Sequence, residues 1–286
     1  MNPSPNFRSG IALILLSACA FGSMAIFARG AFAAGANVPG LLAGRFAIAG
    51  FALAAFMVAT GRPFPRGRPL AFAIGMGGIG YVGQAACFFT ALHYASAGLV
   101  ALLLYAYPTL VVILSAIFLG QRLTSRRVAL LVASFAGLAL MLGGGSGTPT
   151  GIALGLSAAA IYSVYILVGS RELSGTDALA STTVICLSAA GTLAIASLFI
   201  ETRLPATTWG WASIAALGVV GSVVAILAFF AGLKRVGPST ASVVSTFEPV
   251  FTAVLAWIVL GETLSAAQLA GGALVVGTAA MLARGR

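Results

Sequence analysis

The amino-acid sequence predicts an all-α integral membrane protein whose ten transmembrane helices form two inverted five-helix repeats. Three observations lead to this fold class: an apolar composition, a series of apolar runs of membrane-spanning length, and a pattern of residues that recurs at one fixed offset. Apolar residues make up 60% of the 286 positions and charged residues only 7%, whereas a soluble domain carries roughly 25% charged residues. So little charged surface excludes a water-soluble globule.

Apolar runs of suitable length account for nearly the whole chain. A helix of about 20 apolar residues crosses the hydrocarbon core of a bilayer, and short segments rich in glycine, proline or charge separate such runs here. The predicted helices cover residues 10–28, 38–59, 70–92, 96–119, 125–142, 151–170, 178–200, 208–233, 238–260 and 264–283. The segments between them are too short to form a soluble domain.

An internal repeat organises these helices. The segment Gly10-Ile11-Ala12-Leu13 recurs as Gly151-Ile152-Ala153-Leu154, an offset of 141 residues (151 minus 10). The same offset relates Phe88-Phe89 to Phe229-Phe230, Pro108 to Pro249, and Leu119-Gly120 to Leu260-Gly261. The sequence therefore predicts a first repeat over 1–142, a glycine-rich linker over 143–150 and a second repeat over 151–286. Because five helices is an odd number, the second repeat must enter the membrane from the opposite side.

The positions of the basic residues predict the orientation. Loops rich in Lys and Arg tend to stay in the cytoplasm. With both termini inside, twelve of the fifteen basic residues are cytoplasmic, Arg29 and Arg203 face outward, and Arg45 lies within the second helix. The net charge of +10 is scattered over inter-helix loops, and nucleic-acid binding needs a clustered basic face. We therefore expect a lipid bilayer and no nucleic acid as partner.

Inverted repeats favour transport. Two similar halves that exchange conformations convert an outward-open state into an inward-open one, as in many secondary transporters. Inverted repeats also occur in channels, so a passive channel is an alternative. The sequence leaves the energy coupling open between proton antiport and facilitated diffusion. It also leaves the oligomeric state open, although a monomer is plausible because each half can pack against the other.

Polar residues at membrane depth are the candidate substrate-binding residues, because polar groups in hydrocarbon need a cavity or a partner. Glu248 is the only acid predicted near mid-membrane, and Pro249 beside it frees the backbone carbonyl of Ser245. Hydroxyl side chains at three- and four-residue steps form a polar stripe on the same helix, and one of them, Ser245, is itself a candidate cavity residue. Functionally, Glu248 would bind a substrate amine or a proton. The alternative is a neutral carboxyl that only packs the kink.

Arg45 and several aromatic or amide residues complete the candidate cavity. Arg45 could meet a substrate carboxylate or pair with Glu248. The alternatives are an arginine that extends its side chain to the membrane surface and one with a purely structural role. Aromatic and amide groups around a cavity suit a small amphipathic solute, although aromatic residues also fill ordinary helix interfaces. The remaining candidates are Tyr81, Gln84, Phe88, Tyr162 and Tyr165, with Tyr105 and Tyr107 as secondary ones.

The sequence contains no recognisable catalytic or cofactor-binding constellation. It has one histidine and five acidic residues, and it lacks the zinc-protease, phosphate-loop and nucleophile-elbow motifs. We therefore expect no catalytic residue, no metal and no cofactor. A membrane enzyme acting on lipid-linked substrates is a competing class, but it should show acids or histidines clustered near one membrane surface.

The sequence resembles the EamA family of the drug/metabolite transporter superfamily, and within it the YddG-type amino-acid exporters. The resemblance rests on segment 10–13, Arg45-Phe46, the segment 88–92, the helix end 119–123, and Glu248-Pro249 followed by segment 260–264. It implies ten helices with cytoplasmic termini, a central cavity, and export of amino acids or related metabolites across the bacterial inner membrane. Gln121 departs from the family's usual glutamate, which Glu262 retains. The substrate could also be a different metabolite or a drug.

Overall fold

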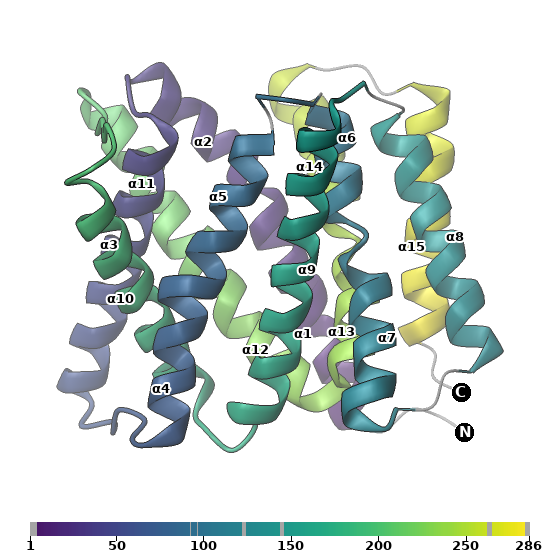
Figure 1. Ribbon diagram of the computed structural model, residues 1–286, viewed down its shortest axis with the longest axis horizontal. Helices are drawn as coiled ribbons and strands as arrows, with labels where there is room; N and C mark the ends of the chain where they lie inside the picture. Colours follow the sequence, from purple (N-terminus) through teal and green to yellow (C-terminus); the bar gives the residue numbers. More distant parts are fainter. Residues whose placement is uncertain are drawn as a thin grey trace.

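The computed structural model describes residues 5–91, 93–95, 97–121, 124–143, 146–261 and 265–283, and within these ranges the fold is entirely helical (Figure 1). The first repeat contains α1 (Pro5–Gly22), α2 (Met24–Ala33), α3 (Val38–Ala59), α4 (Arg68–Gly75), η1 (Met76–Tyr81), α5 (Val82–Ala91), α6 (Ala97–Leu104), α7 (Tyr107–Leu119) and α8 (Ser125–Leu142). The second contains α9 (Pro149–Glu172), α10 (Ala178–Ala196), α11 (Thr208–Gly218), η2 (Val219–Val224), α12 (Ala225–Val236), α13 (Pro238–Ser245), α14 (Glu248–Leu260) and α15 (Ala266–Ala283).

These elements combine into the predicted transmembrane spans. Among the described residues, nine helical runs are long and apolar enough to cross a membrane, and a shorter apolar helix covers Ala266–Met281. The predicted ten-helix, all-α membrane fold is thus confirmed. Several boundaries differ from the prediction by a few residues. The largest differences are at the first span, which covers Asn6–Ala33 instead of 10–28, and at the seventh, which ends at Ala196 instead of 200.

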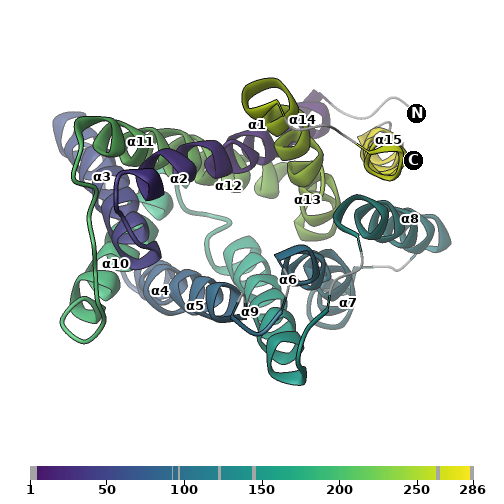
Figure 2. The same cartoon turned by 90° about the horizontal axis from the view of Figure 1, so that it is seen from above.

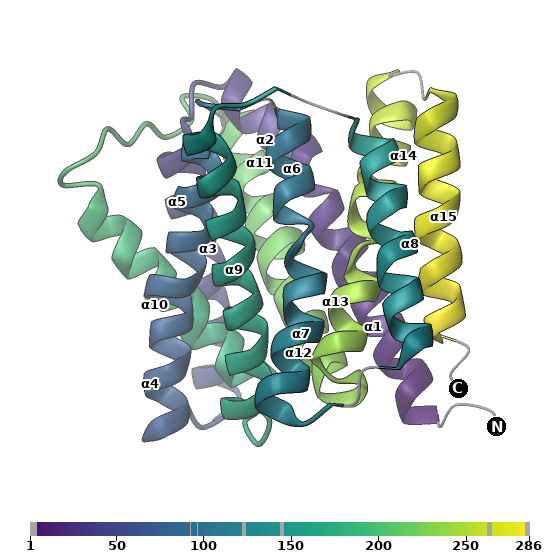
Figure 3. The ribbon, with the colours of Figure 1, turned by 45° about the vertical axis from the view of Figure 1, so that its right-hand side comes forward.

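The second half runs through the membrane in the opposite sense to the first. In Figures 1 and 3, α1 begins on the face that carries both termini, whereas α9 begins on the other face. The main helix contacts join the two halves: α1 packs on α12, α5 on α9, α3 on α10, α7 on α9 and α13, and α8 on α15. The halves therefore interlock, and neither buries its apolar helix faces alone.

Glycines permit the closest of these approaches, as expected where small residues line helix crossings in membranes. Gly137 on α8 and Gly271 on α15 face each other, and a Cβ added to Gly271 would lie 2.4 Å from the Gly137 carbonyl oxygen. Gly77 in η1 packs against α10, where an added Cβ would lie 2.2 Å from the carbonyl oxygen of Ile185. These contacts join the two halves backbone to backbone.

We expect Gly77→Ala to lower the thermal stability of the purified protein, because the added methyl group overlaps backbone that cannot move away. Overpacking of this kind costs about 1–3 kcal/mol. Gly83, on the same transmembrane span, has open space around its Cα, so Gly83→Ala is the matched control and should be neutral or slightly stabilising. Melting curves in detergent measure both variants. Equal melting temperatures would contradict the packing argument.

Helix interruptions recur at equivalent places in the two halves. The fourth span breaks between α6 and α7, and the ninth breaks between α13 and α14; Pro108 and Pro249 stand in the first turn of the resumed helices. Neither proline can donate a backbone hydrogen bond, so the helix cannot continue through it with full hydrogen bonding. The third and eighth spans each contain a π-helical segment, η1 and η2. Irregular backbone at membrane depth is tolerated where it lines a cavity or is buried in protein.

Viewed from above, the helices surround the middle of the molecule (Figure 2). The elements α1, α2, α11 and α12 lie along one side, while α4, α5 and α9 lie along the other. The broken helices α6/α7 and α13/α14 approach the middle from the end where α8 and α15 also stand. This arrangement directs the interrupted backbone of both halves toward one central region.

Candidate functional site

A central cavity of about 360 Å³ lies between the two halves. Its wall combines residues of α1, α2, α3, η1, α5, α6, α7, α9, α11 and α14, so both halves contribute. Eight of the ten residues predicted from the sequence line it: Arg45, Tyr81, Gln84, Phe88, Tyr105, Tyr107, Tyr162 and Glu248. The remaining lining is apolar, which gives the cavity a few polar groups in an otherwise hydrophobic wall.

The two helix breaks place side chains in this cavity. Tyr107 is the first residue of α7 and Glu248 is the first residue of α14, and the two are related by the 141-residue offset (248 minus 107). Leu104 and Tyr105, at the end of α6 and in the break, also line the cavity. Each half thus presents the start of a resumed helix to the cavity, a tyrosine from one half and a carboxyl from the other.

Arg45 is buried, with 2% of its surface exposed, and is held mainly by the opposite half. Its Nε donates to the Ser222 hydroxyl at 3.1 Å, and its Nη2 donates to the Tyr81 hydroxyl at 3.1 Å and to the Gly221 carbonyl at 3.2 Å. Its guanidinium lies 4.6 Å from the ring centroid of Phe46. None of the hydrogen bonds among the described residues uses Nη1, so two N–H groups of a cavity-lining residue are not engaged by the protein.

The π-helix η2 explains why a backbone carbonyl reaches Arg45. A π-helical turn alters the helical hydrogen-bond pattern, and such turns are frequent at functional sites. Gly221 and Ser222, which both accept from Arg45, lie within η2. The sequence alternatives of a surface-seeking arginine or an Arg45–Glu248 pair are wrong, since Arg45 is buried and none of the ion pairs among the described residues involves either side chain.

Glu248 occupies a different part of the wall and is surrounded by tyrosines. Its carboxyl interacts with Tyr105 and lies near Tyr107 and Tyr162. Gly22 lets α1 approach it closely, since a Cβ at Gly22 would lie 2.9 Å from the Glu248 carbonyl oxygen. Across the described part of the chain, Glu248 forms no ion pair. The Glu248 carboxyl thus lies among tyrosine side chains and lines the cavity.

Aromatic rings connect these polar groups. Tyr107 and Tyr162 meet edge to face with centroids 4.7 Å apart, and Phe46 and Tyr81 meet in the same way at 4.9 Å. Such pairs add about 0.5–1.5 kcal/mol beyond the burial of their area. The rings therefore fix the walls against which a ligand would rest.

Comparison with known proteins places this architecture in a family. The profile of the EamA-like transporter family matches the chain twice, over residues 8–143 and 149–284. The chain belongs to the EamA-like transporter family. A solved crystal structure with 29% sequence identity superposes on it with a TM-score of 0.82 and covers 97% of each chain.

Individual relatives of this EamA protein are named as transporters. It is 31% identical over 216 residues to the aromatic amino acid exporter YddG of Ancylobacter novellus, and the match covers 72% of this chain and 73% of that one. It is 28% identical over 214 residues to the uncharacterised transporter YyaM of Bacillus subtilis, covering 70% and 69%. An uncharacterised transporter of Archaeoglobus fulgidus is 27% identical over 210 residues, and the match covers 73% of this chain and 75% of that one.

Two predicted residues of the EamA protein lie behind the cavity wall. Tyr165 stacks against Tyr162 at 6.1 Å and meets Tyr81 at 6.0 Å, but its own side chain faces α4 and η1. Three residues along a helix differ in direction by about 60°, which turns Tyr165 away from the cavity that Tyr162 lines. Ser245 is buried on α13, next to the turn whose Ser242 carbonyl accepts a hydrogen bond from the Tyr107 hydroxyl at 3.3 Å. Both therefore support lining residues and do not line the cavity themselves.

Sequence reasoning missed the contribution of the first span. Five of its residues line the cavity: Phe21, Met24, Ala25, Ala28 and Phe32. Their spacing of three or four residues is that of one helical face, so the signal was present. It is indistinguishable from an ordinary packing face, because the residues carry no polar group.

The cavity extends toward the face opposite the termini. Its lining includes Phe32, Leu41 and Phe89, which lie at that end of their spans, and no residue from the ends on the termini side. On the termini side, contacts cross between the halves. The Ser239 hydroxyl donates to the Gln121 amide oxygen at 2.6 Å, and ion pairs join Arg68 to Glu172 and Arg62 to Asp177. These contacts hold the halves together below the cavity.

Proposed function

We propose that this protein is a secondary transporter that exports amino acids, or related small amphipathic metabolites, by alternating access. The observation that carries the proposal is the pair of opposite charges in the cavity: the guanidinium of Arg45 and the carboxyl of Glu248, neither of them ion-paired to the other. A free amino acid carries the complementary pair of charges. A cavity of about 360 Å³ lies within the usual size range of small-molecule sites.

Each of the two charged residues would bind one charged group of the amino acid. A substrate carboxylate would accept from Nη1 of Arg45, since charge-assisted hydrogen bonds to a carboxylate are the strong ones. The ammonium group would donate to Glu248, with the faces of Tyr107 and Tyr162 adding cation–π attraction. An apolar side chain would rest on the first span, at residues such as Phe21 and Met24.

The relatives and the repeats support this assignment. A protein named as an aromatic amino acid exporter is 31% identical to this chain, and the aromatic lining of the cavity suits an aromatic or large aliphatic side chain. In alternating access, the contacts on the termini side would open as those on the other side close. The repeat boundaries proposed from the sequence, 1–142 and 151–286 joined by the linker 143–150, would mark the two moving units.

The membrane orientation belongs to the same proposal. Arg62, Arg68, Arg171 and Lys234 all lie toward the face that carries the termini. By the positive-inside rule this face would be cytoplasmic, in the bacterial inner membrane. The cavity would then extend toward the outside, as expected for an exporter before it resets. A monomer would suffice, because the halves bury each other's helix faces.

Counterflow in liposomes tests the function. Purified protein is reconstituted in vesicles preloaded with an unlabelled amino acid, and uptake of a trace of radiolabelled amino acid is followed across neutral, aromatic and charged side chains. We expect saturable accumulation of the labelled amino acid, and we expect apolar and aromatic amino acids to inhibit it competitively. Linear, non-saturating flux without counterflow would indicate a channel. Counterflow with none of them, in protein shown to be folded, would move the substrate to another class of metabolite or drug.

Energy coupling is tested in the same vesicles. Proton antiport predicts that an imposed pH gradient drives accumulation of the labelled substrate above its equilibrium level. Facilitated diffusion predicts initial rates that are the same with and without the pH gradient, and no accumulation beyond equilibrium.

A further inference from the structure

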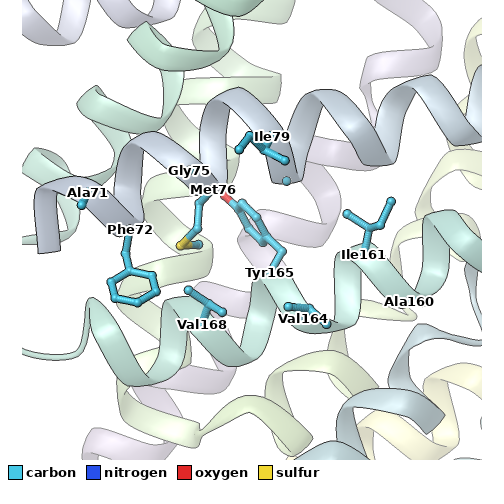
Figure 4. Close-up of a pocket in the computed structure, with 11 residues that line it drawn as sticks. Ala71, Phe72, Gly75, Met76, Ile79, Ala160, Ile161, Val164, Tyr165 and Val168 are labelled. Carbon is cyan, nitrogen blue, oxygen red and sulfur yellow. The ribbon is translucent and has the colours of Figure 1, made fainter. Parts of the chain in front are cut away.

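A second hollow, of about 650 Å³, lies on the outside of the helix bundle and shares no residue with the central cavity. Figure 4 shows its two walls: Ala71, Phe72, Gly75, Met76 and Ile79 come from α4 and η1, and the facing residues come from α9. Except for the Tyr165 hydroxyl, the side chains that line it are apolar. We call this hollow the α4–α9 groove.

The α4–α9 groove faces the bilayer. Ile79 is 78% exposed and Val164 is 52% exposed, and both lie within membrane-spanning segments, where the exposed surface meets lipid chains. Small residues hollow the surface: Gly75 and Gly80 on one wall, Ala160 on the other. Tyr165 forms the floor, between this groove and the Tyr81 side of the cavity.

The dimensions of the groove match one lipid leaflet. From Ala71 to Gly80 the wall runs nine residues, or about 14 Å at the helical rise of 1.5 Å per residue. One leaflet contributes about 15 Å of the hydrocarbon core, which is about 30 Å thick. The groove begins within one turn of Arg68, on the termini side, and ends near mid-depth. An acyl chain of that leaflet would therefore fit along it.

Charge at the mouth of the groove indicates the headgroup. Arg68 opens α4 and Arg171 lies in the last turn of α9, with side chains 70% and 66% exposed. Both pair with one carboxylate, that of Glu172, at 2.8 and 3.7 Å, so the cluster keeps one net positive charge. The Arg68 guanidinium also lies 5.4 Å from the ring centroid of Phe72, a groove residue. The cationic mouth and the apolar groove are thus continuous.

We infer that the α4–α9 groove binds an anionic phospholipid of the leaflet on the termini side, with one acyl chain in the groove and the headgroup at Arg68 and Arg171. Basic residues at the membrane surface attract anionic lipids by about 1 kcal/mol each. The excess of one cation over Glu172 therefore predicts a preference of about fivefold for phosphatidylglycerol over phosphatidylcholine. This lipid site is independent of the transported substrate.

Native mass spectrometry of the purified full-length protein tests the site. The protein is titrated with phosphatidylglycerol or phosphatidylcholine of the same acyl chains, and bound lipid is counted at each concentration. We expect Gly75→Leu to remove the most tightly bound lipid, because Gly75 lines the groove and a Cβ added there meets no protein atom within 4 Å, so the longer side chain would extend into the groove. Gly83→Leu is the matched control, since Gly83 also has open surroundings on the same span but lies outside the groove.

Two further variants keep the test decisive. Ala160→Leu fills the groove from α9 and should reproduce the loss if Gly75→Leu does not fold. Arg171→Gln should retain lipid binding but equalise the two headgroups. The inference is overturned if lipid binding survives both groove-filling variants in folded protein, or if Gly83→Leu loses lipid to the same extent. Equal affinity of the wild-type protein for the two lipids would overturn the headgroup assignment.

Discussion

Arg45→Gln is expected to reduce kcat/KM for amino-acid counterflow by about 100-fold. Hydrogen bonds to charged groups contribute about 1.5–3 kcal/mol each, and 1.4 kcal/mol corresponds to a tenfold change, so the loss of a carboxylate contact and its charge accounts for such a factor. Glutamine keeps an amide donor for the buried surroundings of Arg45, which include the Tyr81 hydroxyl and the Gly221 carbonyl. Initial rates over a range of substrate concentrations measure the effect.

The controls for Arg45→Gln separate binding from structure. Ser222→Ala removes the hydroxyl that accepts from Nε of Arg45 but keeps the guanidinium, so it should lower transport much less, by about tenfold or below. An amino-acid amide lacks the carboxylate. It should inhibit uptake of the labelled amino acid only weakly in the wild-type protein. In Arg45→Gln it should inhibit uptake nearly as well as the unlabelled amino acid does. If both ligands lose affinity equally in Arg45→Gln, Arg45 supports the fold and does not bind the carboxylate.

The fold was largely predictable because membrane spans and repeats leave strong signals. Apolar runs separated by breakers locate helices with little dependence on packing, and one offset related prolines, glycines and paired phenylalanines in both halves. The detail inside the spans was less accessible. Pro108 and Pro249 mark the helix breaks in the sequence, whereas nothing short of packing shows that Met76–Tyr81 and Val219–Val224 adopt π-helical turns.

The candidate site was partly predictable for a similar reason. Polar residues at membrane depth are rare enough to single out, and Arg45, Gln84 and Glu248 all line the cavity. Apolar residues are not rare, so the contribution of Phe21 and Met24 was invisible without the structure. The partners of Arg45 were also beyond reach, because Gly221 and Ser222 come from the other half and from an irregular turn.

The repeat offset also explains why the site is asymmetric. Symmetry-related backbone breaks place Tyr107 and Glu248 at equivalent positions, yet only one of them is an acid. A symmetric scaffold can exchange the conformations of its halves, while unlike side chains at the two breaks can bind unlike ends of one substrate. The shared backbone would therefore serve the conformational exchange, and the different side chains would serve substrate binding.

Glu248→Gln is expected to lower transport of amino acids by about 10- to 100-fold while leaving the yield of folded protein unchanged. The substitution preserves the shape of the side chain and an oxygen that can accept from Tyr105. It removes the charge that would hold a substrate ammonium, a loss in the range of about 1.5–3 kcal/mol for a charge-assisted hydrogen bond. Counterflow rates measure transport, and size-exclusion profiles with melting curves measure folding.

Two comparisons make the Glu248 prediction specific. Tyr105→Phe removes a hydroxyl that supports the carboxyl but keeps the charge, so it should lower transport less than Glu248→Gln does. A 2-hydroxy acid carries a hydroxyl in place of the ammonium group. It should inhibit uptake of the labelled amino acid only weakly in the wild-type protein. In Glu248→Gln it should inhibit uptake about as well as the unlabelled amino acid does. If transport by Glu248→Gln equals that of the wild type, Glu248 has no part in substrate binding, and the carboxyl only packs the break between α13 and α14.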